Sequence, residues 1–446
     1  MKKLYIITLC MAVCASGATA GNHFKTKRGT QRKAVAKTEK AEKLWRPASQ
    51  SEYMYDGEGW MLLGTTEFTY DNRGNAISTL SEDEDGTFKS VTEYDDNNMP
   101  VSIINTSDSG DGWENDSKRT YVYDPVLHDY FTERLGYDWN GTDWVRNYLC
   151  ETNTITRNDK GGITEIVKSL PIFDNLAPAY KAVWNYDDAT GMANAFSYYV
   201  NTSGDMTPLW ELNDDISYHN IVWAETDGQM TEASMYDFLS GKNRISSCEV
   251  RYMGDTDGYF FVEYPADKPG EYFAKETYND PTVIGATTRL EILDANGSYR
   301  ITDCEYFDED GNPTTEPTYI GVQDFTIDEH GNLVLEERYE TYEESVNELM
   351  SSTKYDYTYD ENGNVKELVI AYYDFDAEGY IPDSKIEYGE YTDVSAGVDN
   401  IAVDKAVSAT VYNLQGIPVL TGATAGDLDS LPAGIYIFNG KKHLVR

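Results

Sequence analysis

Cysteine is scarce in this sequence, and its scarcity excludes a disulfide-stabilised scaffold. Only five cysteines occur in 446 residues, and Cys10 and Cys14 lie in an N-terminal segment with the features of a signal peptide. The remaining Cys150, Cys248 and Cys304 allow at most one bridge, which would leave one thiol free. The stability of the mature chain is therefore expected to come from packing and strand pairing.

Histidine is equally scarce, and no catalytic or metal-binding motif is present. There is no His-x-x-x-His or Cys-x-x-Cys pair, so no zinc site is predicted, and neither a Gly-x-Ser-x-Gly elbow nor a phosphate loop occurs. These features favour a non-catalytic protein without a cofactor, although a glycosidase carboxylate pair stays open because it is defined in space. The five histidines are His23, His128, His219, His330 and His443.

Basic residues are few, and most of the chain is strongly acidic. The sequence has 36 Lys and Arg against 77 Asp and Glu, a formal net charge of −41. Nine of the basic residues lie between residues 21 and 46, so the rest of the mature chain is more acidic still. This excess excludes a nucleic-acid partner, because phosphates would be repelled, and it favours solubility outside the cell.

The N-terminus predicts export. A basic start, Met1–Lys3, precedes an apolar stretch, Leu4–Ala15, and the small residues Ala18–Ala20 suit signal-peptidase cleavage. We therefore assign residues 1–20 to a signal peptide and residues 21–50 to a basic, disordered leader. No later segment is apolar enough to span a membrane. The expected location is extracellular or the outer cell surface, with the periplasm as the alternative.

Aspartate and glycine recur in a fixed turn pattern. Asp-x-x-Gly occurs thirteen times, whereas chance placement predicts about three occurrences. The Asp side chain accepts a hydrogen bond from the backbone two residues on, and Gly supplies the positive φ that starts the returning strand. Tyr355, Tyr357 and Tyr359 alternate along one flank, which is typical of a strand. The aspartates stand at 56, 71, 83, 138, 159, 188, 255, 267, 294, 308, 328, 360 and 376.

A longer spacing indicates repeated units. Trp45, Trp60 and Trp113 each stand ten residues before a Tyr-Asp pair. Residues 196–290 keep the composition but lose this register, and we assign them to the repeat region as well. These turns resemble the YD/RHS-type repeats of bacterial surface and secreted proteins, and more closely the W…YDxxGN arrays of secreted Bacteroidetes proteins. The resemblance implies that residues 51–392 form an all-β, extended antiparallel β-hairpin array, a meander or solenoid whose repeats bury one another's aromatic face.

The composition changes near residue 393, where Val, Ala, Gly and Leu replace Tyr and acidic residues. The segments VYNLQG, LPAGIYI and KKHLVR predict strands and turns, and together they resemble the C-terminal sorting domain of the Bacteroidetes type IX secretion system. The resemblance implies that residues 393–446 form a small β-sandwich-like domain recognised by the type IX machinery. The residues that would carry this sorting signal are Tyr412, Gly416, Leu431, Pro432, Gly434, Ile435, Tyr436, Lys441, Lys442 and Val445.

Two ligand hypotheses remain open. Asp-x-Asp-Gly occurs at 83–86, 255–258 and 308–311, but an EF-hand register would place Tyr306 and Pro317 at ligand positions. Turn formation is the favoured interpretation, and weak Ca²⁺ binding at millimolar levels is the alternative. All eight tryptophans precede residue 224, which fits repeat packing or, alternatively, a glycan-binding or carbohydrate-active site in that half. The leading hypothesis is a secreted or surface-displayed, non-catalytic interaction or adhesion scaffold that binds an extracellular protein or glycan.

Overall fold

The computed structural model describes residues 44–110, 112–172, 175–226, 228–231, 239, 243–342 and 345–394, and four strands beyond residue 408. Contacts within the chain divide it into two compact units, Met1–Ser395 and Ala396–Arg446. All regular elements in the described part of the chain are β-strands, apart from single turns. None of the described segments is a helix of the length and apolarity needed to cross a membrane.

The first unit contains strands that follow one another as antiparallel hairpins. Its first strands are β1 (Trp45–Pro47), β2 (Ser49–Tyr55), β3 (Trp60–Tyr70), β4 (Ala76–Asp83), β5 (Gly86–Tyr94), β6 (Pro100–Asp108), β7 (Glu114–Tyr123), β8 (Phe131–Trp139), β9 (Trp144–Arg146), β10 (Glu151–Arg157), β11 (Ile163–Ile172) and β12 (Asn175–Tyr186). Its later strands are β13 (Ala193–Asn201), β14 (Trp210–Glu225), β15 (Arg244–Tyr252), β16 (Asp255–Glu263), β17 (Tyr272–Tyr278), β18 (Ile284–Ile292), β19 (Tyr299–Glu305), β20 (Tyr319–Ile327), β21 (Leu333–Tyr342), β22 (Ser345–Tyr359), β23 (Val365–Asp374), β24 (Gly379–Tyr388) and β25 (Tyr391–Asp393).

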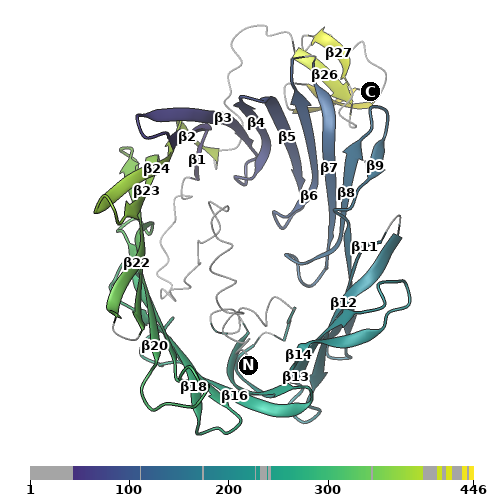
Figure 1. The fold of residues 1–446 in the computed structure, drawn as a ribbon. Helices are drawn as coiled ribbons and strands as arrows, with labels where there is room; N and C mark the ends of the chain where they lie inside the picture. The colour runs from purple at the N-terminus through teal and green to yellow at the C-terminus, as the bar shows by residue number, and fades with distance from the viewer. Residues whose placement is uncertain are drawn as a thin grey trace, which may run out of the picture. The chain divides into compact units, whose positions relative to one another are not determined.

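These hairpins close into a barrel (Figure 1). From β2 to β24 most strands pair with their neighbours in the chain, β8 pairs with β10 past the short β9, and β24 pairs with β2. The short β1 and β25 pair with each other in a separate two-stranded sheet. Because β9 pairs only with β8, 22 strands of the 23-stranded sheet form the closed ring. The predicted open meander or solenoid is therefore wrong. The hairpins are present, but the last strand of the ring returns to the first.

One-residue register shifts recur where strands turn back at one end of the barrel. They separate Thr69 from Tyr70, Glu93 from Tyr94, and Thr358 from Tyr359 in the ladders with the following strands. Bulges of this kind bend a strand and increase its twist, and they are frequent at barrel rims. Repetition of the same shift around the sheet lets the sheet curve enough to close.

The barrel wall is one strand layer thick, and its buried core is local. Most strand residues of the described chain are half-buried or exposed. One cluster of buried apolar side chains lies on β11–β15 and on the connection after β14, with Trp184 only 1% exposed. Its other members are Ile163, Ile166, Ala182, Ala193, Phe196, Ile221, Met230, Ile245, Cys248 and Val250. Strand pairing therefore has a larger share in the stability than it has in a two-layer fold.

The second unit holds one antiparallel sheet of four strands in the order β27-β26-β28-β29. These are β26 (Ala409–Asn413), β27 (Pro418–Ala423), β28 (Gly434–Phe438) and β29 (Lys441–Val445). The prediction of a sandwich-like domain is wrong, because the described strands of this unit form a single sheet with no second layer.

Candidate functional site: the two rims of the barrel

Successive hairpin connections fall alternately at the two ends of the barrel, because neighbouring strands are antiparallel. We call one end the turn rim. It holds the connections after β3, β5, β7, β10, β12, β14, β16, β18, β20 and β22. We call the opposite end the tip rim. It holds the connections after β2, β4, β6, β8, β11, β13, β15, β17, β19, β21 and β23.

The turn rim contains part of the predicted Asp-x-x-Gly turns, including those at Asp71, Asp294, Asp328 and Asp360, and the tip rim contains others. In the turn after β22, Asp360 Oδ1 accepts hydrogen bonds from the backbone N–H groups of Asn362 and Asn364, each at 2.8 Å. Gly363 adopts a φ of 81° and donates to the Asp360 carbonyl at 3.1 Å, which confirms the predicted turn. The first polar residues of the turns of this type on this rim are Asp71, Asp95, Asp124, Asn158, Asp187, Asp294, Asp328 and Asp360.

The turn carboxylates are held in their charged form. The side-chain hydrogen bond from Asn364 is the largest influence on Asp360, and together with backbone N–H groups it lowers the pKa of that carboxyl. The backbone N–H of Met99 lowers the pKa of Asp95 in the same way. These carboxylates are engaged by their own turns and stay ionised near neutral pH. They therefore act as fixed negative charges and turn formers, and not as proton donors.

Tyrosines that end the strands tie neighbouring turns together. The Tyr94 hydroxyl donates to the carbonyl of Ala76 at 3.1 Å, and the Tyr123 hydroxyl donates to that of Pro100 at 2.9 Å. In each case the acceptor directly follows the neighbouring turn. Burial raises the pKa of Tyr123 to about 12. We call these contacts tyrosine latches. Further latches are made by Tyr70, Tyr186, Tyr264 and Tyr391 to the carbonyls of Pro47, Ile163, Ile245 and Val365.

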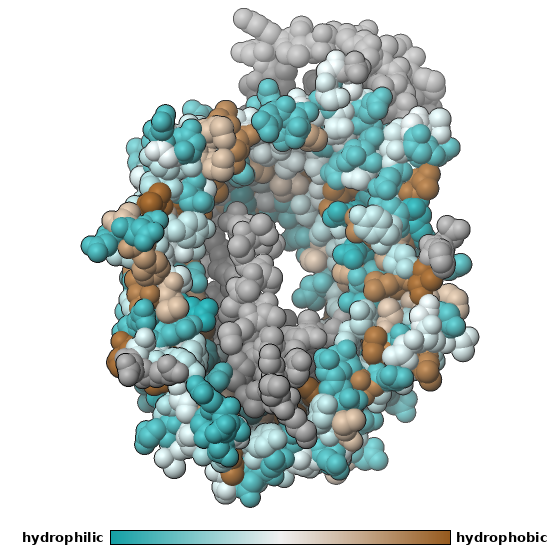
Figure 2. Space-filling model, viewed as in Figure 1, coloured by the Kyte–Doolittle hydropathy of each residue, from teal (hydrophilic) through white to brown (hydrophobic). Residues whose placement is uncertain are grey.

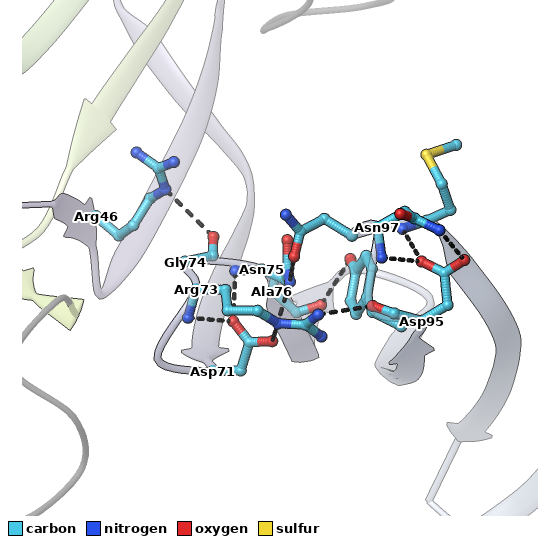
Figure 3. Close-up of polar contacts among 11 residues, drawn as sticks. Arg46, Asp71, Arg73, Gly74, Asn75, Ala76, Asp95 and Asn97 are labelled. Carbon is cyan, nitrogen blue, oxygen red and sulfur yellow. Dashed lines mark hydrogen bonds and ion pairs between the residues drawn. The ribbon is translucent and has the colours of Figure 1, made fainter. Parts of the chain in front are cut away.

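Side chains also connect adjacent turns laterally (Figure 3). Arg73 donates to the carbonyl of Asp95 at 2.7 Å and to Asp71 Oδ2 at 3.2 Å. Asn75 Nδ2 donates to Asn98 Oδ1 at 3.0 Å. The turns after β3 and β5 therefore form one polar network, and the turn rim is a continuous and rigid structure at this point.

The tip rim has hydrogen-bonded turns of the same kind, for example at Asp56 and Asp308. It differs from the turn rim because it carries most of the exposed large apolar side chains of the described chain. Val346 is 79% exposed and Met253 69%, and each lies beside a tip connection. Tyr148, between β9 and β10, is 78% exposed. The exceptions lie nearer the turn rim or in mid-wall: Val91, Val122, Val126, Met192, Val222 and Leu293. This asymmetry was missed by sequence reasoning, which did not separate alternate turns into two ends.

Most tryptophans lie either at the tip rim or in the core cluster. Trp60, Trp113, Trp139, Trp144 and Trp210 border tip connections. The rings of Trp139 and Trp144 pack edge to face, with centroids 5.1 Å apart. Trp184 and Trp223 instead belong to the core cluster or pack against it.

Both faces of the wall carry charge. Residues paired directly across an antiparallel ladder point to the same face. Arg134, Glu151 and Lys168 lie on the face that carries the tyrosine latches, and Glu151 binds both cations, at 3.0 and 3.3 Å. The other face carries the ion pair between Arg300 and Asp324, at 2.6 Å. The wall therefore lacks a purely apolar face, whichever face points outward.

The predicted sorting residues fall in the second unit. Tyr412 lies in β26, Gly434, Ile435 and Tyr436 lie in β28, and Lys441, Lys442 and Val445 lie in β29. The ladder pairs Gly434 with Val445, and Tyr412 with Ile437. The four-stranded sheet of the second unit therefore contains most of the predicted sorting residues. The remaining residues, Gly416, Leu431 and Pro432, lie outside the described residues.

Cysteine and metal chemistry give no further site. Cys150, Cys248 and Cys304 are free thiols, and the first two are buried. Within the described ranges, no group of three or more His, Cys, Asp or Glu side chains is arranged to hold a metal ion. The Asp308 carboxylate of one Asp-x-Asp-Gly segment accepts hydrogen bonds from its own turn, at 2.8 Å from the Asn312 backbone nitrogen.

Comparison with known proteins gives a limited result. No protein-family model matches the chain, and no curated protein matches it. A solved porin-like protein from Bacteroides uniformis ATCC 8492 is 8% identical, with 77% of this chain and 96% of that chain covered and a TM-score of 0.21. A porin-like protein from Bacteroides vulgatus ATCC 8482 is 11% identical, with coverage of 77% and 97% and a TM-score of 0.15. Similarity this low carries no argument about the present chain, whose barrel is defined by its own strand pairings.

Proposed function

We propose that this protein is an exported, non-catalytic β-barrel scaffold that acts at the outer cell surface and presents its rims to an extracellular partner. The single observation that carries the proposal is the contrast between the rims. Turns of both rims form hydrogen bonds of their own, but tyrosine latches and Arg73 also tie neighbouring turns of the turn rim together, whereas the tip rim exposes most of the large apolar side chains. Interaction surfaces are rich in exposed apolar patches, and the signal-peptide pattern of residues 1–20 supports export.

The wall supports a peripheral surface location in place of a lipid-embedded one. Arg or Lys on a lipid-facing barrel surface costs about 2–4 kcal/mol at the bilayer midplane, and both faces carry such residues, for example Arg134 and Arg300. We further propose that residues 396–446 direct transport to the surface through the type IX machinery. Support for this step comes from the resemblance of the tail to the sorting domain of that system.

Fractionation of cells that express the full chain or a chain without residues 396–446 tests both parts. The full chain should be cleaved by protease added to intact cells, and alkaline carbonate should release it from membranes. The truncated chain should be protected in the periplasm. Surface exposure of the truncated chain would remove the sorting role, and resistance of the full chain to carbonate would make the barrel an integral membrane protein.

A glycan partner is the second candidate, and the tryptophans at the tip rim favour it. Trp113 is 50% exposed, and exposed indole rings stack well on sugar faces. If glycans bind there, Trp113→Ala should reduce retention of the protein on immobilised polysaccharides, while Val126→Ala on the turn rim should not. Equal retention of both variants would leave a protein partner as the supported reading.

A further inference from the structure

The exposed apolar side chains are concentrated on three neighbouring hairpins of the tip rim. The hairpins β21/β22, β23/β24 and β2/β3 are consecutive around the ring, because β22 pairs with β23 and β24 pairs with β2. Figure 2 shows hydrophobic residues among hydrophilic ones over β22–β24, at the left of the view. We call the exposed large side chains of these hairpins the tip patch: Met54, Met61, Leu62, Leu63, Tyr342, Val346, Met350, Tyr372, Phe375, Tyr380 and Ile381.

Strand β22 extends past its neighbour within this patch. It pairs with β21 back to Ser345, but its ladder with β23 begins only at Thr353. Residues 345–352 therefore have a described partner strand on one side only. Asn347 has a φ of 53° and interrupts the extended backbone. The free edge that follows is Glu348–Ser352; it contains a bulge at Met350 and ends at Ser352, which is 3% exposed. A free edge presents backbone N–H and C=O groups that an added strand can pair with.

The charge around the patch is predominantly negative. The cations that border it, Arg338, Lys354 and Lys385, each form an ion pair with an acidic side chain. The segments 47–72, 339–353 and 367–384, which include the three hairpin tips, contain acidic residues and no Lys or Arg. A second copy of this chain would bring two acidic borders together, and an anionic lipid surface would be repelled. A partner that covers the apolar side chains must therefore be basic at its border.

We propose that the tip patch and the free edge of β22 form a docking surface for an extended, basic segment of a partner protein. The segment adds as a strand along Glu348–Ser352 and places its apolar side chains on the patch residues that share one face of the wall, such as the directly paired Tyr372 and Ile381, while its Lys or Arg residues face the acidic border. Main-chain hydrogen bonds supply affinity in this mode of recognition, and side chains supply specificity.

The test uses the mature full chain and a labelled peptide of five Val-Lys repeats, with a peptide of five Val-Glu repeats as its comparison. Fluorescence anisotropy should show binding of the Val-Lys peptide alone, weakened by salt, and hydrogen exchange should slow at residues 348–352. Met350→Lys and Ile381→Lys should each weaken binding at least tenfold, because each places a like charge in the patch. Leu293→Lys on the turn rim and Met206→Lys on a distant tip should leave the affinity unchanged.

Several results would overturn the proposal. Equal binding of the two peptides would remove the charge argument, and unchanged exchange at residues 348–352 would remove strand addition. Equal losses in Met350→Lys and Met206→Lys would show that the patch has no special role. Self-association, or binding to zwitterionic phosphatidylcholine vesicles, that Met350→Lys abolishes would assign the surface to a second copy or to lipid. Circular dichroism checks the fold of every variant, and the two patch substitutions lie on different strands, so misfolding of one leaves the other decisive.

Discussion

The turns of the turn rim are stabilised by a few residues with defined structural roles. Asp360 organises its turn through three acceptor contacts, two to backbone N–H groups and one to the Asn364 side chain at 2.9 Å. Gly363 supplies the left-handed backbone at the fourth position. Both roles are local, which explains why the turn was predictable from four letters of sequence.

Substitution of the turn glycine tests this assignment. We expect Gly363→Val to destabilise the barrel by about 1 kcal/mol or more, because a β-branched residue resists a φ of 81°. Chemical denaturation measures the free energy of unfolding, and the exposed Glu361→Ala in the same turn is the matched control. Equal stability of the two variants would contradict the turn assignment.

The tyrosine latches predict a loss of stability at high pH. Burial raises the pKa of Tyr70 and Tyr123 to about 12 from an ordinary value of 10.0. Because the folded pKa is raised, their contribution is complete below pH 10 and is lost as pH rises toward 12. The ultraviolet absorbance of tyrosinate should therefore show a late-titrating group that appears together with unfolding. Titration of every tyrosine near pH 10 while the protein stays folded would contradict the latches.

Glu276 is expected to cause a second loss of stability with rising pH, which begins at a lower pH than that of the tyrosine latches. Burial raises its pKa to about 7, and Asp257 adds to the shift. Its protonated form is favoured in the folded state, so the stability that depends on it is present below pH 4.5 and falls as pH rises through 7. Glu276→Gln should stabilise the protein at pH 8 by on the order of 1 kcal/mol and have little effect at pH 4. An unchanged difference in stability between pH 4 and pH 8 would refute this view.

At the scale of elements, the important contact is the pairing of β24 with β2. The ladder joins Gln50–Met54 to Ser384–Tyr388 and closes the ring, while the other joints of the ring connect strands that are neighbours in the chain or nearly so. Pairing of strands this far apart in the chain costs conformational entropy, because the long intervening segment must be closed into a loop. The closing ladder therefore distinguishes a barrel from the open array expected from the sequence.

A proline in the closing strand tests this element. Glu52→Pro removes a ladder N–H and should destabilise the barrel by about 3 kcal/mol or more. Glu361→Pro is the control, because it stands at the second position of a type I-like turn, where proline is favoured. Denaturant midpoints and the radius of gyration from X-ray scattering are the measurements. Similar midpoints for both variants would mean that closure contributes little.

At the scale of the whole molecule, the chain consists of two units with separate contact networks. Removal of residues 396–446 should leave the thermal transition of the barrel within about 2 °C of that of the full chain, because separate cores unfold separately. Differential scanning calorimetry of both purified chains measures this, and it is independent of any role in transport. A large drop in the melting temperature of the barrel would show that the second unit stabilises the first.

The sequence by itself determined the local structure of this protein. Aspartate turns, tyrosine-rich strands and hairpin-after-hairpin order follow from interactions within a few residues. The ten-residue spacing from Trp60 to Tyr70 corresponds to one complete strand, from the tip rim to the turn rim. Even residues 196–290, where the repeat register is lost, continue as hairpins with longer connections after β14 and β16.

Closure of the barrel and the division of its turns into two rims could not be predicted from the sequence and became evident from the three-dimensional structure. Closure depends on pairing between residues more than 300 positions apart and on curvature accumulated from many small bulges, and neither leaves a local signal. The sequence also hid which face of the wall points outward, because both faces alternate apolar with charged residues. The tip patch became visible only when closure placed β24 beside β2, since its side chains come from segments at opposite ends of the barrel sequence.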